Sequence, residues 1–578
     1  MKRVMWPMSA AIAFAALILS FAQLAPSHRE LSSLFPDNAL LYLEAKDFRA
    51  LLKDWNVSEE KRIWLKGDNY EAFSRSRLFG RLGQARDEFS TAASIPVGEN
   101  LLSSIAGTQS ALALYDIGNL EFVYLTRMSQ AQAESTALWQ VRDKFEPRTE
   151  GTAQFYVRQD QQSNRTAAFA ARDGWLILGT RVDLVAGVLD RLQGAKAHSL
   201  SDETWYTDTL QQAAGSDQDL RMILNLEKIV PSPYFRSYWV QRNITEMKQY
   251  RAALCDLHRG AQSYQEDRVL LRKPGVTGNA SGDVQSLLAL APTDAVFASA
   301  QASPDADRVV AEMRENVLDF KTMQMRATGF APSNVAAENA GSTAMLEERI
   351  DVAPVIVKES DPYQPLRLLI AAAQPAAVLE AYETRSKTDD MFVGINRAIV
   401  VQSASPWNEE AMESSLAIAL RPGLTTSQLG IEWKSHTGEH GKYTSLDGEI
   451  PISLAVRGNQ LFLATSESLL QILLAPRTPS APSQLGGVTY AAVFNHSPHE
   501  QQAFRKIVNR LDAAGHGGNA QKTSPEEDAA ESDGQSPFFS RNIASMGRML
   551  AHVVRESIEE RDQGTQVTQK LIYEWQRP

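Results

Sequence analysis

A pattern of two short strands followed by a helix occurs twice in this chain. AFAARDGWLILGT (168–180) aligns without a gap with SLAVRGNQLFLAT (453–465). In each, residues alternate up to a turn that contains Asp173-Gly174 or Gly458-Asn459, and an almost wholly apolar stretch follows. This arrangement is typical of a β-hairpin. The segments that come next, DLVAGVL and SLLQILL, have the apolar spacing of a helix.

Other matched landmarks occur in the same order in both halves of the chain. They are FPDNALLYLEA (35–45) with APTDAVFASAQA (291–302), DLRMILNL (219–226) with VTYAAVFN (488–495), SPYF (232–235) with SPFF (536–539), and SYQEDRVLLRKP (263–274) with VTQKLIYEWQRP (567–578). A period of roughly 250 residues indicates duplicated domains, because solenoid units are far shorter. We therefore predict a tandem repeat.

The order of elements mixes hairpin-like strand pairs with helices. This favours an α+β fold with an antiparallel or mixed sheet covered by helices in each copy. We place copy one at 31–274, a linker rich in glycine and small polar residues at 275–286, and copy two at 287–578. The insertion at 512–536 lacks aromatic and nearly all large aliphatic residues, so we expect a mobile loop there.

The N-terminal segment predicts export from the cytoplasm. Lys2 and Arg3 precede an uncharged apolar run at 4–25. A basic start followed by such a run is typical of a signal peptide (1–26), and the run is also long enough to remain as a membrane anchor. Either outcome places the rest of the chain on the periplasmic side of an inner membrane, with residues 4–25 as the contact with that membrane.

Composition and charge narrow the function classes. Hydrophobic residues make up 43% of the 578 residues and charged residues 22%, which indicates a chain that folds over most of its length. The formal net charge is -11, and there is no basic stripe with interleaved aromatics, so nucleic-acid binding is disfavoured. Cys255 is the only cysteine and cannot form an internal disulfide. It lies in TEMKQYRAALCDLHR, whose apolar spacing suggests a helix and a buried core thiol.

Residues 55–89 also have helical spacing. Their larger apolar side chains could form one core-facing stripe, and they are Trp64, Phe73, Leu78, Phe79 and Leu82. We interpret this stripe as packing between a helix and a sheet.

One motif raises the question of a metal site. HTGEH contains His436, Glu439 and His440, and it fits the H-x-x-E-H pattern of inverted zinc peptidases. That site needs a helix that brings both histidines to one face. Gly438 lies inside the motif and residues alternate on either side, so strand, loop and strand are predicted instead. The corresponding loop of copy one is QDQQSNR (159–165), which holds no histidine, and we expect no metal, cofactor or catalytic residue here.

The opening LFPDNALLYLEAKDFRALLKDW (34–55), with the strand-turn-strand-helix unit around 168–189, resembles a group of bacterial exported proteins catalogued only as a domain of unknown function. The resemblance covers most of the chain after residue 30. It implies an envelope location and brings no activity or catalytic residue to transfer.

Three functions remain open at this point. The first is a non-enzymatic envelope protein that binds or scaffolds other envelope proteins. The second is a carrier of a hydrophobic ligand in a groove between the copies. The third is a metal-dependent hydrolase that uses the HTGEH segment, although a third ligand such as Glu526 or Glu527 falls in the predicted mobile loop.

Overall fold

The fold is given by a computed structural model of the chain. The structure describes residues 30–58, 61–62, 65, 70, 73–215, 217–238, 247–278, 282, 284–318, 361–385, 394–424, 432–447, 451–476, 487–495 and 553–575. The chain divides into two compact units, which are described separately. Unit one takes in residues up to 52, 81–211 and 222–244, and unit two takes in 53–80, 212–221 and 245 onward.

Unit one is built on an antiparallel sheet. Its strands are β1 Leu41–Ala45, β2 Ser110–Asp116, β3 Glu121–Arg127, β4 Glu146–Glu150, β5 Ala153–Gln159, β6 Thr166–Arg172, β7 Trp175–Gly179 and most of β8 Leu220–Asn225. Their pairing follows the order β4-β5-β6-β7-β3-β2-β1-β8. The predicted hairpin at 168–180 is confirmed as β6 and β7, with Asp173 at φ +51° and Gly174 at φ +79° in its turn.

Unit two is also antiparallel. Its strands are β9 Tyr250–Arg259, β10 Ser263–Arg272, β11 Phe297–Ala302, β12 Pro375–Arg385, β13 Gly394–Ser403, β14 Lys434–Gly438, β15 Gly441–Leu446, β16 Ile452–Arg457, β17 Gln460–Ala464, β18 Tyr490–Asn495, β19 Val553–Asp562 and β20 Gln566–Trp575. One run of pairings is β14-β15-β16-β17-β13-β12-β11-β18. From β18 the pairing continues through β19, β20 and β10 to β9.

The same series of pairings therefore occurs twice. Adding ten to each label of the unit-one series gives the series from β14 to β18 in unit two. The predicted copies, 31–274 and 287–578, assign β9 and β10 to the first copy, whereas the compact units group them with unit two. The part of the predicted linker that is described also bonds within unit two, where the Gly278 amide donates to the Gly564 carbonyl at 2.9 Å.

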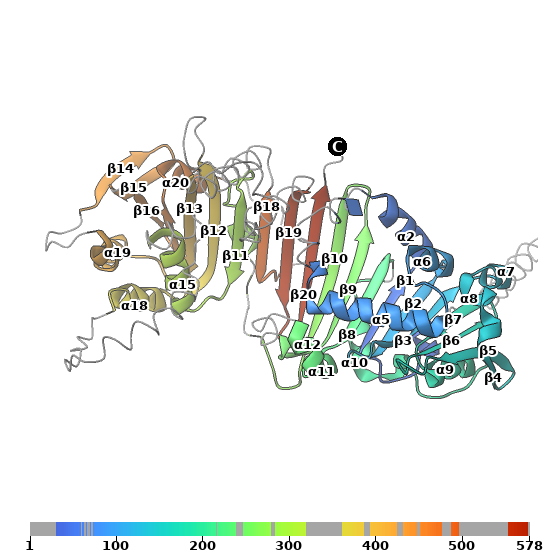
Figure 1. The fold of residues 1–578 in the computed structure, drawn as a ribbon. Helices are drawn as coiled ribbons and strands as arrows, with labels where there is room; N and C mark the ends of the chain where they lie inside the picture. The colour runs from blue at the N-terminus through green and yellow to red at the C-terminus, as the bar shows by residue number, and fades with distance from the viewer. Residues whose placement is uncertain are drawn as a thin grey trace, which may run out of the picture. The chain divides into compact units, whose positions relative to one another are not determined.

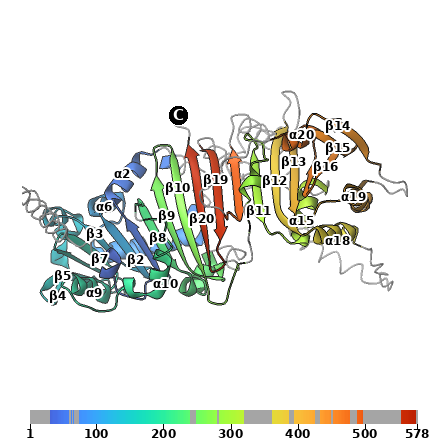
Figure 2. The same cartoon turned by 180° about the vertical axis from the view of Figure 1, so that it is seen from behind.

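Helices cover both faces of the unit-one sheet. They are η1 Leu31–Leu34, α2 Phe48–Val57, α5 Arg77–Ala93, α6 Glu99–Ile105, α7 Gln130–Glu134, α8 Ala137–Gln140, η2 Arg142–Lys144, α9 Val182–Leu192, η3 Leu200–Asp202, α10 Thr204–Leu210, α11 Leu226–Ile229 and α12 Pro233–Tyr238. Figure 1 shows α5 in front of the unit-one strands, and Figure 2 shows the same strands from behind. The predicted helix after β7 is confirmed as α9, which packs on β6 and β7.

The close approach of α9 depends on a glycine. A Cβ added at Gly179 would lie 2.8 Å from Cγ2 of Val185, so only a glycine at the end of β7 leaves room for the helix. The opposite face carries a separate core, in which Phe89 of α5 and Leu101 of α6 pack with Phe169 and Leu178 of the sheet.

In unit two, helices α14 Gln285–Leu288, α15 Ala306–Met313, α18 Gln364–Ala373, α19 Glu409–Leu424 and α20 Glu467–Leu474 surround the strands, and α15 continues into a π-helical turn, η4, at Arg314–Leu318. Two core clusters form, one around Leu469 and Phe462 and the other around Met313 and Leu416. The helix predicted after the second hairpin is confirmed as α20. Both units thus combine an antiparallel sheet with covering helices, the predicted α+β class.

The prediction for Cys255 was wrong. Its segment forms strand β9 instead of a helix, and the thiol is half-buried. Ala252, Leu254 and Asp256 are the buried positions of the strand. The buried member Asp256 is a charged residue, and its carboxylate accepts hydrogen bonds from Arg221 Nε at 2.7 Å and Nη2 at 2.6 Å. Because the charged residue Asp256 occupies a buried position of β9, hydrophobic and polar residues do not alternate along this segment as they do in a typical half-buried strand.

Several predictions concern residues outside the described ranges. They are the export segment at 4–25, the mobile loop at 512–536 with Glu526 and Glu527, Trp64 of the apolar stripe and the SPFF landmark. Among the helices that are described, none combines the length and apolar character needed to cross a bilayer.

Candidate functional site

Unit one contains an apolar pocket of about 370 Å³ between its helices and its sheet. The lining comes from α2 (Phe48), α5 (Leu82, Ala85, Arg86, Phe89), the α5–α6 segment and α6 (Val97, Leu101, Leu102, Ile105), β2 (Leu112, Leu114), the β2–β3 turn and β3 (Leu120, Phe122, Tyr124), and Arg165, Leu178 and Thr180. The volume is within the range of small-molecule sites.

Helical spacing on α5 and strand alternation on β2 turn these side chains toward the pocket. On α5, Leu82, Ala85 and Phe89 follow helical spacing and share a face. On β2, Leu112 and Leu114 alternate with Ala111 and Ala113, which are buried on the opposite side of the sheet. The predicted core-facing stripe differs from expectation, because Phe73, Leu78 and Phe79 are only half-buried and Leu82 is 43% exposed. Leu82 borders the pocket instead of filling a core.

Most polar groups of the lining are already engaged by the protein. The Tyr124 hydroxyl donates to the carbonyl of Ile105 at 3.0 Å, and burial raises the pKa of this phenol. The Thr180 hydroxyl accepts the Phe122 amide at 2.8 Å and lies 3.3 Å from the Phe122 carbonyl. A ligand in this pocket therefore contacts mainly apolar side chains, and it can bind without breaking buried hydrogen bonds.

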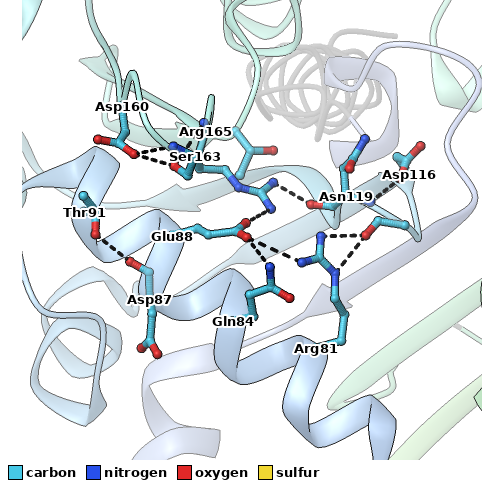
Figure 3. Close-up of polar contacts among 12 residues, drawn as sticks. Arg81, Gln84, Asp87, Glu88, Thr91, Asp116, Asn119, Asp160, Ser163 and Arg165 are labelled. Carbon is cyan, nitrogen blue, oxygen red and sulfur yellow. Dashed lines mark hydrogen bonds and ion pairs between the residues drawn. The ribbon is translucent and has the colours of Figure 1, made fainter.

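A cluster of charged residues joins α5 to neighbouring loops beside the pocket (Figure 3). Arg165 is 8% exposed, and its Nη2 lies 2.7 Å from Glu88 Oε2. Arg81 Nη1 lies 3.6 Å from Glu88 Oε1, and Gln84 donates to the same oxygen at 2.8 Å. Burial alone would raise the pKa of Glu88, but the hydrogen bond from Arg165 and the charges of Arg165 and Arg81 lower it.

The same arginines hold the turn between β2 and β3. Arg165 Nη1 donates to the Asn119 carbonyl at 2.5 Å, and Arg81 donates to the Gly118 carbonyl through Nε at 3.0 Å and Nη2 at 2.7 Å. Figure 3 shows both guanidinium groups between α5 and this turn. Glu88 thus fixes the position of α5, which forms one wall of the pocket.

Arg86 differs from the other arginines because it faces solvent. It lines the pocket, its side chain is 56% exposed, and its Nη2 lies 2.8 Å from Asp87 Oδ1, which is itself 70% exposed. An exposed ion pair of this kind contributes about 0 to 1 kcal/mol, so an anionic ligand can replace Asp87 at little cost.

The structure confirms the strand, turn and strand predicted for HTGEH. β14 and β15 pair with His436 opposite Tyr443, and Glu439 and His440 form the turn between them. The His436 ring stacks on Tyr443 with centroids 5.0 Å apart, and its Nε2 lies 2.8 Å from Ser445 Oγ. In the order of strand pairing, the β14–β15 hairpin corresponds to the β4–β5 hairpin of unit one. The predicted match with residues 159–165 is therefore wrong, because that loop joins β5 to β6.

Among the described residues, one group of side chains has the spacing of metal ligands. Oxygen and nitrogen atoms of Asp37, His198 and Glu203 lie within 4.8 Å of one another, and His436, Glu439 and His440 are not part of such a group. His198 Nδ1 lies 3.4 Å from Asp37 Oδ2, and both side chains are well exposed. Sequence reasoning missed this group because Asp37 lies far from His198 and Glu203 in the chain, and the three residues follow no motif spacing.

Sequence reasoning also missed the pocket. Its lining is drawn from segments between Phe48 and Thr180, and only the alternation on β2 and the stripe on α5 signal it in the sequence. Elsewhere, Cys255 lies 3.9 Å from Glu266 Oε2, and burial, with the nearby Glu266 charge, raises the pKa of its thiol to about 11. It is a poor nucleophile in this setting.

No protein-family model matches the chain, and no curated protein does. Among solved structures, crystal form I of TP0453 is similar with a TM-score of 0.25 and 10% sequence identity, over 42% of this chain and 79% of that one. Crystal form IV of TP0453 is similar with a TM-score of 0.23 and 11% identity, over the same shares of the two chains.

Proposed function

We propose that this chain is a non-enzymatic binding protein of the bacterial envelope that holds an apolar ligand in the pocket of unit one. The observation that carries the proposal is the lining itself. It is formed almost wholly by aliphatic and aromatic side chains, and Tyr124, Thr180 and Arg165 already bond to protein groups. Such a pocket favours binding of hydrocarbon and offers no free acid or nucleophile from its lining.

The pocket changes the predicted location of the ligand site in the carrier hypothesis. Sequence reasoning placed a hydrophobic groove between the two copies, whereas every residue of this pocket belongs to unit one. We retain export through residues 4–25, a periplasmic location and relation to the exported family of unknown function as parts of the proposal. A tether at residues 4–25 would hold the pocket near a membrane, which is a source of apolar molecules.

We further propose that the chain contains two tandem copies of one α+β domain. The repeated series of strand pairings supports this. Two pairs of hydrogen bonds support it at single residues. Thr180 and Thr465 are matched in the sequence. The Thr180 amide donates to the Phe122 carbonyl, and the Thr180 hydroxyl accepts from the Phe122 amide. Thr465 makes the same two hydrogen bonds with Arg397. The backbone amide of Asn225 donates to the Leu40 carbonyl, and the backbone amide of Asn495 donates to the Val296 carbonyl. Leu40 and Val296 lie in the matched segments 35–45 and 291–302.

The test of binding is a titration of the full chain with a fluorescent alkyl probe. Ala85→Trp should fill the pocket from α5 and weaken binding by at least about tenfold. Ala131→Trp, at an exposed position of helix α7, is the matched control and should bind as the wild type does. Should Ala85→Trp fail to fold, Leu102→Asp puts a charge at a rim position that is 42% exposed. Unchanged binding in these variants, or no binding by the wild type, would overturn the proposal.

A further inference from the structure

Two arginines, Arg86 and Arg165, line the pocket. Arg81 belongs to the cluster beside the pocket through Glu88, and Asp87 is the ion-pair partner of Arg86. Glu88 is shared between Arg81 and Arg165, so their charges are committed to the cluster. Arg86 is the group whose partner is an exposed neighbour in the sequence.

Exposed apolar residues of the pocket lining lie close to Arg86. Leu82 is one helical turn before Arg86 on α5, and it is 43% exposed. Leu102 of α6 is 42% exposed and also lines the pocket. A ligand whose chain lies against these leucines therefore has its other end within reach of a guanidinium group. Guanidinium binds carboxylate and phosphate with two parallel hydrogen bonds.

From this arrangement we infer that the ligand is an amphiphile with one hydrocarbon chain and an anionic headgroup, of the fatty-acid class. The chain enters the pocket, and Arg86 exchanges Asp87 for the headgroup. The volume of about 370 Å³ is at the lower end for ligand sites and suits one chain. This inference rests on the proposed function and adds the class of ligand and the residue that selects it.

The experiment compares dodecanoate with dodecanol at neutral pH, each displacing a fluorescent alkyl probe from the full chain. The two ligands have the same chain and differ in headgroup charge. We expect dodecanoate to bind about tenfold more tightly than dodecanol, because a hydrogen bond to a charged group is stronger than one to a neutral group. Arg86→Gln should remove this preference by lowering the affinity for dodecanoate about tenfold. Arg148→Gln, at an exposed arginine of β4, should leave both affinities unchanged.

The outcomes separate the two proposals. Equal affinity of the wild type for both ligands would overturn the inference and leave apolar binding intact. Displacement by neither ligand would overturn the proposed function as well. A third arm adds phosphatidylglycerol vesicles and phosphatidylcholine vesicles. Sedimentation with the anionic vesicles that depends on Arg86, without a preference for free dodecanoate, would show that Arg86 meets a membrane surface, and this result also overturns the inference.

Discussion

At the scale of single residues, unit two contains a polar group formed by the buried Asn316 and the half-buried Glu312, Glu380 and Tyr382. Asn316, in the π-helical turn η4, is 3% exposed and donates from Nδ2 to Glu380 Oε1 at 2.6 Å. The Tyr382 hydroxyl lies 2.8 Å from Asn316 Oδ1 and 3.2 Å from Glu380 Oε2. Glu312 bonds Arg308 at 2.8 Å through Oε1, and its Oε2 is buried without a hydrogen-bond partner.

These two carboxyl groups titrate above their ordinary range. Burial raises the pKa of Glu380, and the charge of Glu312 raises it further. Burial also raises the pKa of Glu312, although Arg308 opposes the shift. A group whose pKa is raised by folding contributes stability below its unfolded pKa, and this stability is lost as pH rises through the folded pKa. Ionisation of this pair therefore weakens unit two above the ordinary glutamate range.

We predict that Glu380→Gln stabilises the protein by about 1 kcal/mol near neutral pH, because it removes a half-buried charge and keeps a hydrogen-bond acceptor for Asn316. The gain should shrink as pH falls toward the ordinary glutamate pKa, where the wild-type carboxyl is protonated. Urea unfolding at a series of pH values measures this, with Glu410→Gln at an exposed position of α19 as the control. A variant that is less stable than the wild type at neutral pH would contradict the assignment.

At the scale of elements, helix α5 depends on a charged contact as well as on its apolar face. Glu88 is its link to Arg165 and, through Arg81, to the β2–β3 turn. Removal of the carboxylate leaves Arg165, which is 8% exposed, with an unbalanced charge. An uncompensated charge of this kind costs more than the pair contributes when intact.

We predict that Glu88→Gln lowers the free energy of unfolding by about 2 kcal/mol at neutral pH. The pKa of Glu88 is lowered in the folded state, so its contribution is present above the unfolded pKa and is lost as pH falls through the folded value. The difference between variant and wild type should therefore disappear in acid. Asp87→Asn, one residue earlier and largely exposed, is the matched change and should have almost no effect. Equal losses in both variants would contradict the role of Glu88.

Sequence patterns predicted some elements and missed others for identifiable reasons. The hairpins at 168–180 and 453–465, with α9 and α20 after them, follow alternation and helical spacing without interruption. β9 was missed because Asp256 is buried with Arg221. The match of 219–226 with 488–495 differs by one residue from the hydrogen bonds, which align Asn225 with Asn495. Turns and pairings fix such a register, and a local comparison of sequences does not.

At the scale of the molecule, the proposed copies differ where they could bind ligands. In unit one the space between α5, α6 and the strands β2 and β3 holds the apolar pocket. In unit two the strands β12 and β13 are covered by α15 and η4, and the polar group around Glu380 lies there. No local pattern predicts this difference, because each lining combines side chains from distant segments.

Photocrosslinking tests the central claim, that the unit-one pocket binds an apolar chain, most directly. An uncharged alkyl diazirine is added to the full chain at equal concentration and irradiated, and the adducts are mapped by mass spectrometry. The account predicts adducts on the lining residues of α5, α6, β2 and β3 that disappear with excess unlabelled alkane chain. Adducts spread over exposed peptides, or adducts that persist with excess competitor, would contradict it.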